Sequence, residues 1–206
     1  WVAQIPLFAT FGAGNIPMAP STALLFLSFG TVLFFSARMP QSRAARRMGF
    51  AFGWSVTIVS LLLLILSSLG IRPIFEHLGM QIAETANGVL IGHMSPVTAL
   101  CFALAGLSFL ALLSTSSGRK WWAATALGLA SLLVLTAIAL ILAYILGRPM
   151  LYGTGIIPPA LPTSLALLLL GTAILIPSGQ RTWPHDVLPE TASRRTTYVF
   201  ILTFLL

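Results

Sequence analysis

The chain has 206 residues, of which 57% are hydrophobic and 7% are charged, and its net charge is +7. Soluble domains carry about a quarter charged residues, so this composition excludes an ordinary water-soluble protein and indicates an integral membrane protein. A chain of this length has room for roughly six spanning helices, which leaves no space for a soluble catalytic domain.

Long apolar runs predict five spans, in chain order at 20–37, 48–70, 95–113, 121–147 and 161–177, and a sixth helix that begins near Tyr198. The expected fold class is all-α, a polytopic transmembrane helical bundle that forms a single domain. Residues 1–17 are apolar but interrupted by Gly12, Gly14 and Pro17, which favours an outer-face or re-entrant segment over a span. The start without Met and the short apolar run at the end favour a fragment of a longer chain.

The basic residues gather in alternate loops between the predicted spans. Nine of the 11 lie in the first, third or fifth loop: Arg38, Arg43, Arg46, Arg47, Arg119, Lys120, Arg181, Arg194 and Arg195. Short cytoplasmic loops retain Lys and Arg, so these loops are expected to face the cytoplasm. Nucleic-acid binding would need such charges on one folded surface together with stacking aromatics, and the sequence indicates neither.

Three helix starts have similar sequences. They read PSTALLFLSFG from Pro20, PVTALCFALAG from Pro96 and LPTSLALLLLG from Leu161, and in each a Thr precedes a Gly by eight positions. The pattern predicts helical hairpins repeated about every 65 residues, with one more helix before Trp1. Proline is tolerated in a first turn, where a nearby Ser or Thr oxygen can cap the exposed amides. Small residues seven positions apart share a helix face, which favours close helix packing over ligand contact.

Catalytic and ion-conducting chemistry finds little support. No Asp, Glu, Lys, Arg or His falls in the middle of an apolar run, which argues against an ion path or a proton relay. The chain has no Walker loop, nucleophile elbow or zinc-protease helix motif, so no catalytic residue is assigned. Its one cysteine, Cys101, lies in an apolar run and is expected to be a packing residue.

Polar side chains gather instead in the loops of the outer side. Two sets could bind metal: Glu76, His77, Glu84 and His93 for a divalent ion, and Met18, Met80 and Met94 for copper. Ion pairing of Arg72 with Glu76 or Glu84 at the membrane interface, with the histidines as caps or hydrogen-bond partners, is favoured over a metal site, and no metal site is assigned. The cofactor, if there is one, stays open.

The outer loops could also converge on a ligand pocket in the outer half of the bundle. Pockets between helices are mostly apolar with a few polar groups. The residues expected around this pocket are Phe11, Asn15, Met18, Glu84, Asn87, His93, Met94 and Tyr152. Loop packing without a cavity is the alternative.

The strings MAPSTALLFLSFG, HMSPVTALCFALAG and LYGTGIIPPALPTSLALLLLG, followed by IPSGQRTW, resemble the N-terminal multi-pass membrane sensor region of bacterial histidine kinases, hybrid kinases included, and of related diguanylate cyclases. The resemblance implies a homodimeric module of a two-component receptor in the bacterial inner membrane. It implies a kinase or cyclase output domain after residue 206. It assigns no catalytic residue here, because the phosphoacceptor histidine and the nucleotide-binding motifs would follow Leu206.

The favoured function is a membrane sensory module that responds to a small apolar or amphipathic ligand or to the bilayer itself. The alternative is a small-molecule permease or a cofactor-binding subunit of a membrane complex, which the hairpin repeat and the glycine-broken outer segments also fit. A membrane enzyme comes third and would need the outer Glu and His residues to hold a metal in one cluster.

Overall fold

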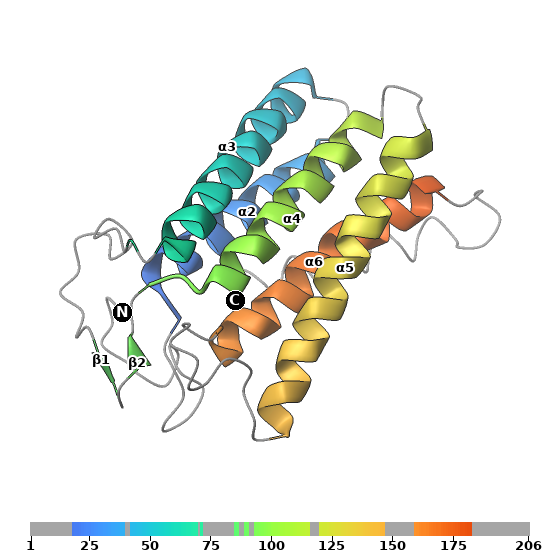
Figure 1. Ribbon diagram of the computed structural model, residues 1–206. Helices are drawn as coiled ribbons and strands as arrows, with labels where there is room; N and C mark the ends of the chain where they lie inside the picture. The colour runs from blue at the N-terminus through green and yellow to red at the C-terminus, as the bar shows by residue number, and fades with distance from the viewer. Residues whose placement is uncertain are drawn as a thin grey trace.

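The computed structural model describes residues 18–39, 42–69, 71, 85–86, 89–90, 93–115, 120–146 and 159–182. Five helices occupy these ranges: α2 Pro20–Arg38, α3 Arg43–Ser68, α4 Pro96–Ser114, α5 Lys120–Ile145 and α6 Leu161–Thr182. They run side by side and alternate in direction (Figure 1). All five are long and apolar enough to cross a membrane. The prediction of an all-α, polytopic bundle is confirmed, whereas residues 1–17 and the sixth helix near Tyr198 lie outside the described residues.

Two short strands accompany the helices. Strands β1 Thr85–Ala86 and β2 Val89–Leu90 pair antiparallel, with Thr85 opposite Leu90 and Ala86 opposite Val89. In the sequence Asn87 and Gly88 join them, a dipeptide typical of two-residue hairpin turns. The sequence analysis did not predict this ribbon, which lies near the end of the bundle where α2 and α4 begin (Figure 1).

The helix limits agree with the prediction except at two ends. Helix α3 begins at Arg43 rather than at 48, because the Ser42 side chain accepts a hydrogen bond from the Ala45 amide at 3.3 Å and caps an earlier start. Helix α6 continues to Thr182 rather than ending at 177, although Pro177 lies inside it. Pro177 has no amide to donate to the Ala173 carbonyl, and spanning helices tolerate such a proline inside them. The neighbouring Ser178 hydroxyl donates to the Ile174 carbonyl at 2.7 Å.

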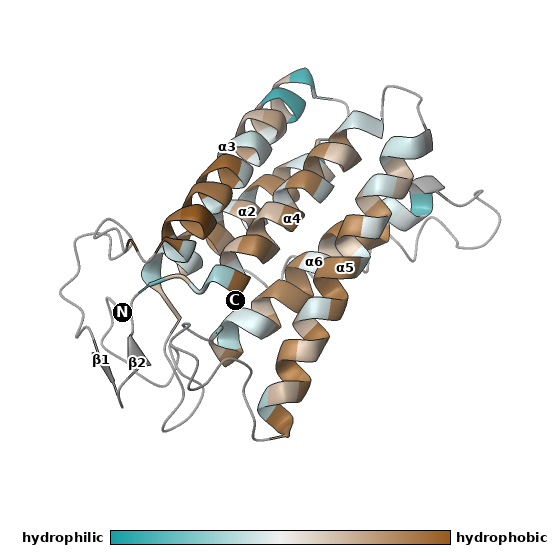
Figure 2. Ribbon diagram, viewed as in Figure 1, coloured by the Kyte–Doolittle hydropathy of each residue, from teal (hydrophilic) through white to brown (hydrophobic). Residues whose placement is uncertain are grey.

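The two ends of the bundle differ in chemistry. Helices α2, α4 and α6 begin at one end, which we call the proline end, with Pro20, Pro96 and Pro162 in their first two positions. At the opposite end, the basic end, α2 and α6 finish and α3 and α5 start. It carries Arg38, Arg43, Arg46, Arg47, Lys120 and Arg181. Figure 2 shows hydrophilic residues at the start of α3 and the end of α6 on this side, as alternate basic loops predict.

Small residues let α3 and α4 approach closely. A Cβ atom added at Gly49 would lie 2.9 Å from the Leu113 side chain, and one added at Gly53 would lie 2.8 Å from the Leu110 side chain. On the α4 side, Gly106 lies against the Thr57 hydroxyl of α3. A Cβ atom added at Gly106 would lie 3.3 Å from the Gly53 carbonyl oxygen. Membrane helices associate through such van der Waals contacts, because lipid supplies no hydrophobic drive between them.

Helices α5 and α6 form the most extensive pair in the described bundle, followed by α3 and α4. The buried face of α5 is mostly alanine, at a spacing of three or four residues: Ala123, Ala126, Ala130, Ala137 and Ala143, with Leu133 and Leu140. Opposite it, a Cβ at Gly171 of α6 would lie 2.8 Å from the Val134 side chain. Gly106 and Gly171 therefore each contact the helix that precedes their own, and their predicted packing role is confirmed.

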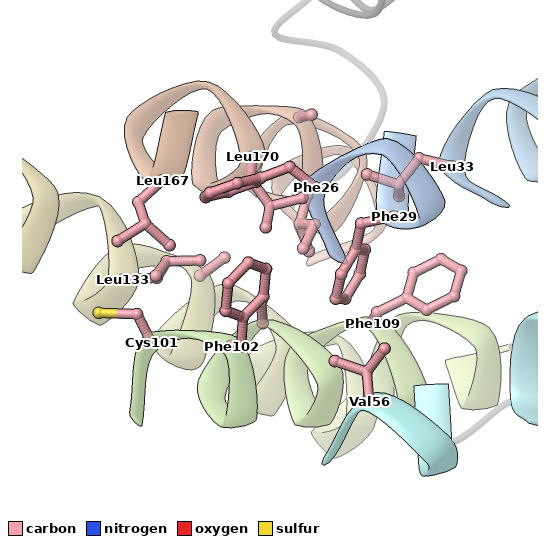
Figure 3. Packing of buried hydrophobic residues seen from close by; sticks show 14 of the residues in the cluster. Phe26, Phe29, Leu33, Val56, Cys101, Phe102, Phe109, Leu133, Leu167 and Leu170 are labelled. Carbon is pink, nitrogen blue, oxygen red and sulfur yellow. The ribbon is translucent and has the colours of Figure 1, made fainter. Parts of the chain in front are cut away.

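An aromatic cluster joins α2 to α3 and α4. Phe29 of α2 is fully buried, and its ring centroid lies 5.3 Å from that of Phe52, 6.0 Å from Phe109 and 6.4 Å from Phe102. Phe26 lies one turn earlier, 4.7 Å from Phe102. Figure 3 shows the rings of Phe26, Phe29, Phe102 and Phe109 between α2 and α4, with Leu167 and Leu170 of α6 beside them. Edge-on and offset ring contacts of this kind favour one helix arrangement beyond simple burial.

One hydroxyl links α4 to α5. Ser108 is fully buried, and its hydroxyl donates to the Ala126 carbonyl at 2.8 Å. Interhelical hydrogen bonds in membranes contribute about 0.6 kcal/mol on average, so we expect S108A to lower the free energy of unfolding in detergent by about that much. T125A is the control, because the exposed Thr125 hydroxyl donates within its own helix to the Trp121 carbonyl at 2.9 Å. An equal loss in both variants would contradict an interhelical role for Ser108.

Candidate functional site

Two of the predicted site residues enter the core at the proline end. Met94 is 4% exposed and belongs to the main buried cluster, and Met18 is partly buried against the same cluster. Their neighbour His93 is half-buried just before α4. The other predicted residues lie outside the described part of the chain: Phe11, Asn15, Glu84, Asn87 and Tyr152.

Met18 and Met94 occupy matching places in the sequence. Both begin the pattern Met, x, Pro, x, Thr, Ala, Leu, x, Phe, which ends at Phe26 in one copy and Phe102 in the other. These matching phenylalanines contact each other with their centroids 4.7 Å apart. The starts of α2 and α4 therefore bring equivalent residues into one core, and the flexible, polarisable methionines fill its edge.

Buried hydroxyls surround the same end. The repeated threonines Thr22, Thr98 and Thr163 are 2–3% exposed. Ser95 precedes α4 and is 4% exposed, yet its hydroxyl has no hydrogen-bond partner among the described residues. Side-chain capping of α2 and α4 was predicted and is not observed, because Ala19 has no oxygen and Ser95 makes no cap bond. A buried hydroxyl without a partner is unfavourable, so Ser95 could serve a polar group of a ligand.

A tyrosine fixes the start of α6. The Tyr144 hydroxyl, in the last turn of α5, donates to the Pro159 carbonyl at 2.6 Å. This contact holds the end of α5 against the segment that leads into α6. The sequence analysis missed it, although a tyrosine near the predicted end of a span is a suitable signal for a polar contact at that depth.

We expect Y144F to loosen this connection while leaving the fold intact. The loss in stability should be about 0.6 kcal/mol, the average for a hydrogen bond between membrane helices. Hydrogen exchange should become faster in the first turn of α6, near Ser164, and stay unchanged in the middle of α4. Unchanged exchange at the start of α6 would show that the Tyr144 contact does not constrain it.

Most of the candidate metal ligands lie outside the described residues, and the described part of this region is mainly apolar. No group of three or more His, Cys, Asp or Glu side chains occurs among the described residues, and all four acidic residues lie outside them. Cys101 is fully buried in the core beside Phe102, as predicted for a packing residue. The described side chains there are thioethers, phenyl rings and hydroxyls, with the His93 imidazole at the edge. Such a mixture suits apolar or amphipathic molecules.

No family model matches the chain, and neither curated proteins nor solved structures include a significant match. The resemblance to kinase and cyclase sensor regions therefore has no family match behind it. The fold defines a class: a multi-pass membrane protein that resides in a lipid bilayer.

Proposed function

We propose that this chain is the membrane-embedded sensory module of a bacterial two-component receptor and binds a small apolar or amphipathic molecule at the proline end. The observation that carries the proposal is that Met18 and Met94, at the starts of two different helices, pack on one core cluster. That cluster also includes residues in the halves of α5 and α6 nearer this end, such as Ala137 and Leu167. A molecule bound there would contact several helices at once.

The bundle offers a physical route for a signal. We interpret the repeat as two duplicated hairpins, α3–α4 and α5–α6, because these pairs pack most extensively and each closes on a glycine of its second helix. The contacts of α4 with α5 and α6 are less extensive. A ligand that prefers one arrangement of the two hairpins would shift their relative position only by its difference in affinity for the two states. The shift would reach the basic end, which we place on the cytoplasmic side of the bacterial inner membrane. We expect the module to act as a homodimer.

The uncharged interior also favours a sensor over an ion transporter. Within the described helices, Arg and Lys occur only in the first or last turns and no acidic residue occurs. Ionisable side chains near the midplane mark most ion and proton pathways. A small-molecule permease or cofactor-binding subunit remains the second candidate, because duplicated hairpins are also common in transporters.

Native mass spectrometry of the full-length protein tests the binding site. We expect an apolar molecule to co-purify and to be lost in M94Q, which puts a polar amide into the core. M94L keeps the volume and should retain it, and so should M48Q, which changes a residue that is 66% exposed on α3. Retention in M94Q would place the molecule elsewhere. Recovery of a haem or pigment would favour the cofactor-binding alternative.

Distance measurements test the coupling between hairpins. Because Cys101 is the single cysteine, C101A provides a background for spin labels at exposed sites. A label pair at Met48 and Trp121 reports between α3 and α5 at the basic end, and a pair at Ile58 and Leu107 reports within the α3–α4 hairpin. Removing the co-purified molecule should change the first distance and not the second. No change in either distance would contradict the signalling proposal while leaving ligand binding intact.

A further inference from the structure

The lipid-exposed faces of α2 and α3 both continue into arginines at the basic end. On α2, exposed residues recur at a spacing of three or four: Leu24, Leu27, Thr31, Phe35 and Arg38. On α3, the exposed stripe consists of Arg47, Trp54, Ile58, Leu61 and Ile65. The face of α3 with Gly49 and Gly53 is turned toward α4 instead. Each helix therefore presents one surface that is apolar along the span and cationic at its end.

Two guanidinium groups are held on the membrane side of their helix ends. The Arg38 Cζ atom lies 5.8 Å from the centroid of Phe34, one turn back along α2. The Arg46 Cζ atom lies 5.6 Å from the centroid of Phe50, one turn further into α3. Cations within about 6 Å of a ring face are attracted to it. Both charges are thus drawn toward the terminal turns of a span, the last of α2 and the first of α3, at the depth of lipid headgroups rather than extended into water.

The cluster of arginines at the start of α3 would be stabilised by a bound anion. Arg43, Arg46 and Arg47 lie in the first turns of α3, where the helix dipole is positive and disfavours cations. The first turn holds no acidic residue, and neither does any other described part of the chain. An external anion near these exposed side chains would relieve their mutual repulsion.

We propose that this surface binds an anionic phospholipid, with its phosphate held by Arg38, Arg43, Arg46 and Arg47 and an acyl chain along the exposed stripe of α3. From Trp54 to Ile65 the stripe runs about 17 Å at 1.5 Å per residue, close to one leaflet of a hydrocarbon core about 30 Å thick. A free phosphate would use the arginines but not the apolar stripe that continues from them. This site is independent of the ligand proposed at the proline end.

The test uses purified full-length protein in vesicles that contain phosphatidylglycerol and phosphatidylcholine, with retained lipid measured by native mass spectrometry. Each basic residue near a membrane surface contributes about a fivefold affinity for anionic lipid, so R43Q/R46Q/R47Q should bind phosphatidylglycerol roughly 100-fold more weakly at low salt. R181Q/R194Q/R195Q removes three positive charges from another segment of the chain and should weaken binding clearly less than R43Q/R46Q/R47Q does, because the proposal assigns none of these residues to the phosphate. If both variants lose the same affinity for phosphatidylglycerol, the lipid is attracted by net positive charge alone, and the proposed site is overturned.

Two further variants test whether the arginines form a specific phosphate site or act only through their positive charge. Both variants keep the positive charges that orient the protein in the membrane. R43K/R46K/R47K preserves every charge but loses the paired hydrogen bonds of guanidinium to phosphate, and should bind roughly tenfold more weakly. F34L/F50L removes both rings under the guanidiniums and should bind about threefold more weakly, whereas L135A, on the exposed face of α5, should match the wild type. Wild-type affinity in the lysine variant, or displacement of the lipid by excess inorganic phosphate, would overturn the proposal.

Discussion

Replacing Gly106 by alanine is expected to destabilise the bundle by about 2–3 kcal/mol, the upper part of the usual range for overpacking. The new Cβ would collide with the Thr57 hydroxyl and lie 3.3 Å from the Gly53 carbonyl oxygen. Thr57 cannot turn away freely, because its hydroxyl donates to that same carbonyl at 2.8 Å. Helices α3 and α4 would have to separate, and the leucine contacts at Gly49 and Gly53 would loosen with them.

Unfolding in mixed micelles measures this loss, and Gly128 provides the matched control. Gly128 lies in α5, and an added Cβ would have no atom within 4 Å. G128A should therefore be neutral or up to about 1 kcal/mol more stable, since alanine favours helix over glycine. The double variant G106A/T57A removes the colliding hydroxyl and should recover part of the loss. Equal destabilisation by G106A and G128A would show that close packing is not the reason for Gly106.

Span positions could be predicted from the sequence because long apolar runs have one physical solution in a bilayer. The starts of α2, α4 and α6 were predicted within one residue, since a proline fixes each first turn. The start of α3 was placed too late because its first turns are arginine-rich and look like loop. The end of α6 was placed too early because Pro177 normally disfavours a helix interior, whereas this helix continues past it to Thr182.

Contacts between helices were harder to predict than the helices themselves. The repeat identified Gly106 and Gly171 as packing residues, because small residues on one face have few other uses in a membrane. It did not identify their partners, since periodicity indicates a buried face but not which helix covers it. The Asn87-Gly88 dipeptide was a usable hairpin signal, but Asn87 was instead assigned to a pocket.

The candidate site was predictable only in part. Met18 and Met94 could be selected as apolar residues at polar helix starts, and the structure places both on one core. Ser95 and the Tyr144 contact to Pro159 were missed, because burial of a single hydroxyl depends on tertiary packing. The predicted residues outside the described ranges, such as Glu84 and Tyr152, stay predictions.

Replacing Phe29 by alanine is expected to cost about 2 kcal/mol and to loosen α2 from the bundle. In a soluble core Phe to Ala costs about 3–5 kcal/mol, part of which is transfer of the ring from water. That part is small here, because a displaced ring would enter lipid as apolar as the core. What remains is the cavity and the three ring contacts, which join Phe29 to Phe102 and Phe109 of α4 and to Phe52 of α3.

The variant F35A is the control for F29A. It shows how much of the loss in stability comes from removing any apolar side chain, as opposed to removing one that is packed in the core. Phe35 is 48% exposed on the same helix, so F35A leaves no cavity and should change the unfolding free energy by less than about 0.5 kcal/mol. F29L keeps most of the volume and should cost about 1 kcal/mol. Exposure of a cysteine placed at the buried Leu33 of α2, in the C101A background, would report detachment of α2 directly. If F29A and F35A destabilise equally, the aromatic cluster does not hold α2 in place, and α2 must be anchored by its contacts with α3 and α6 instead.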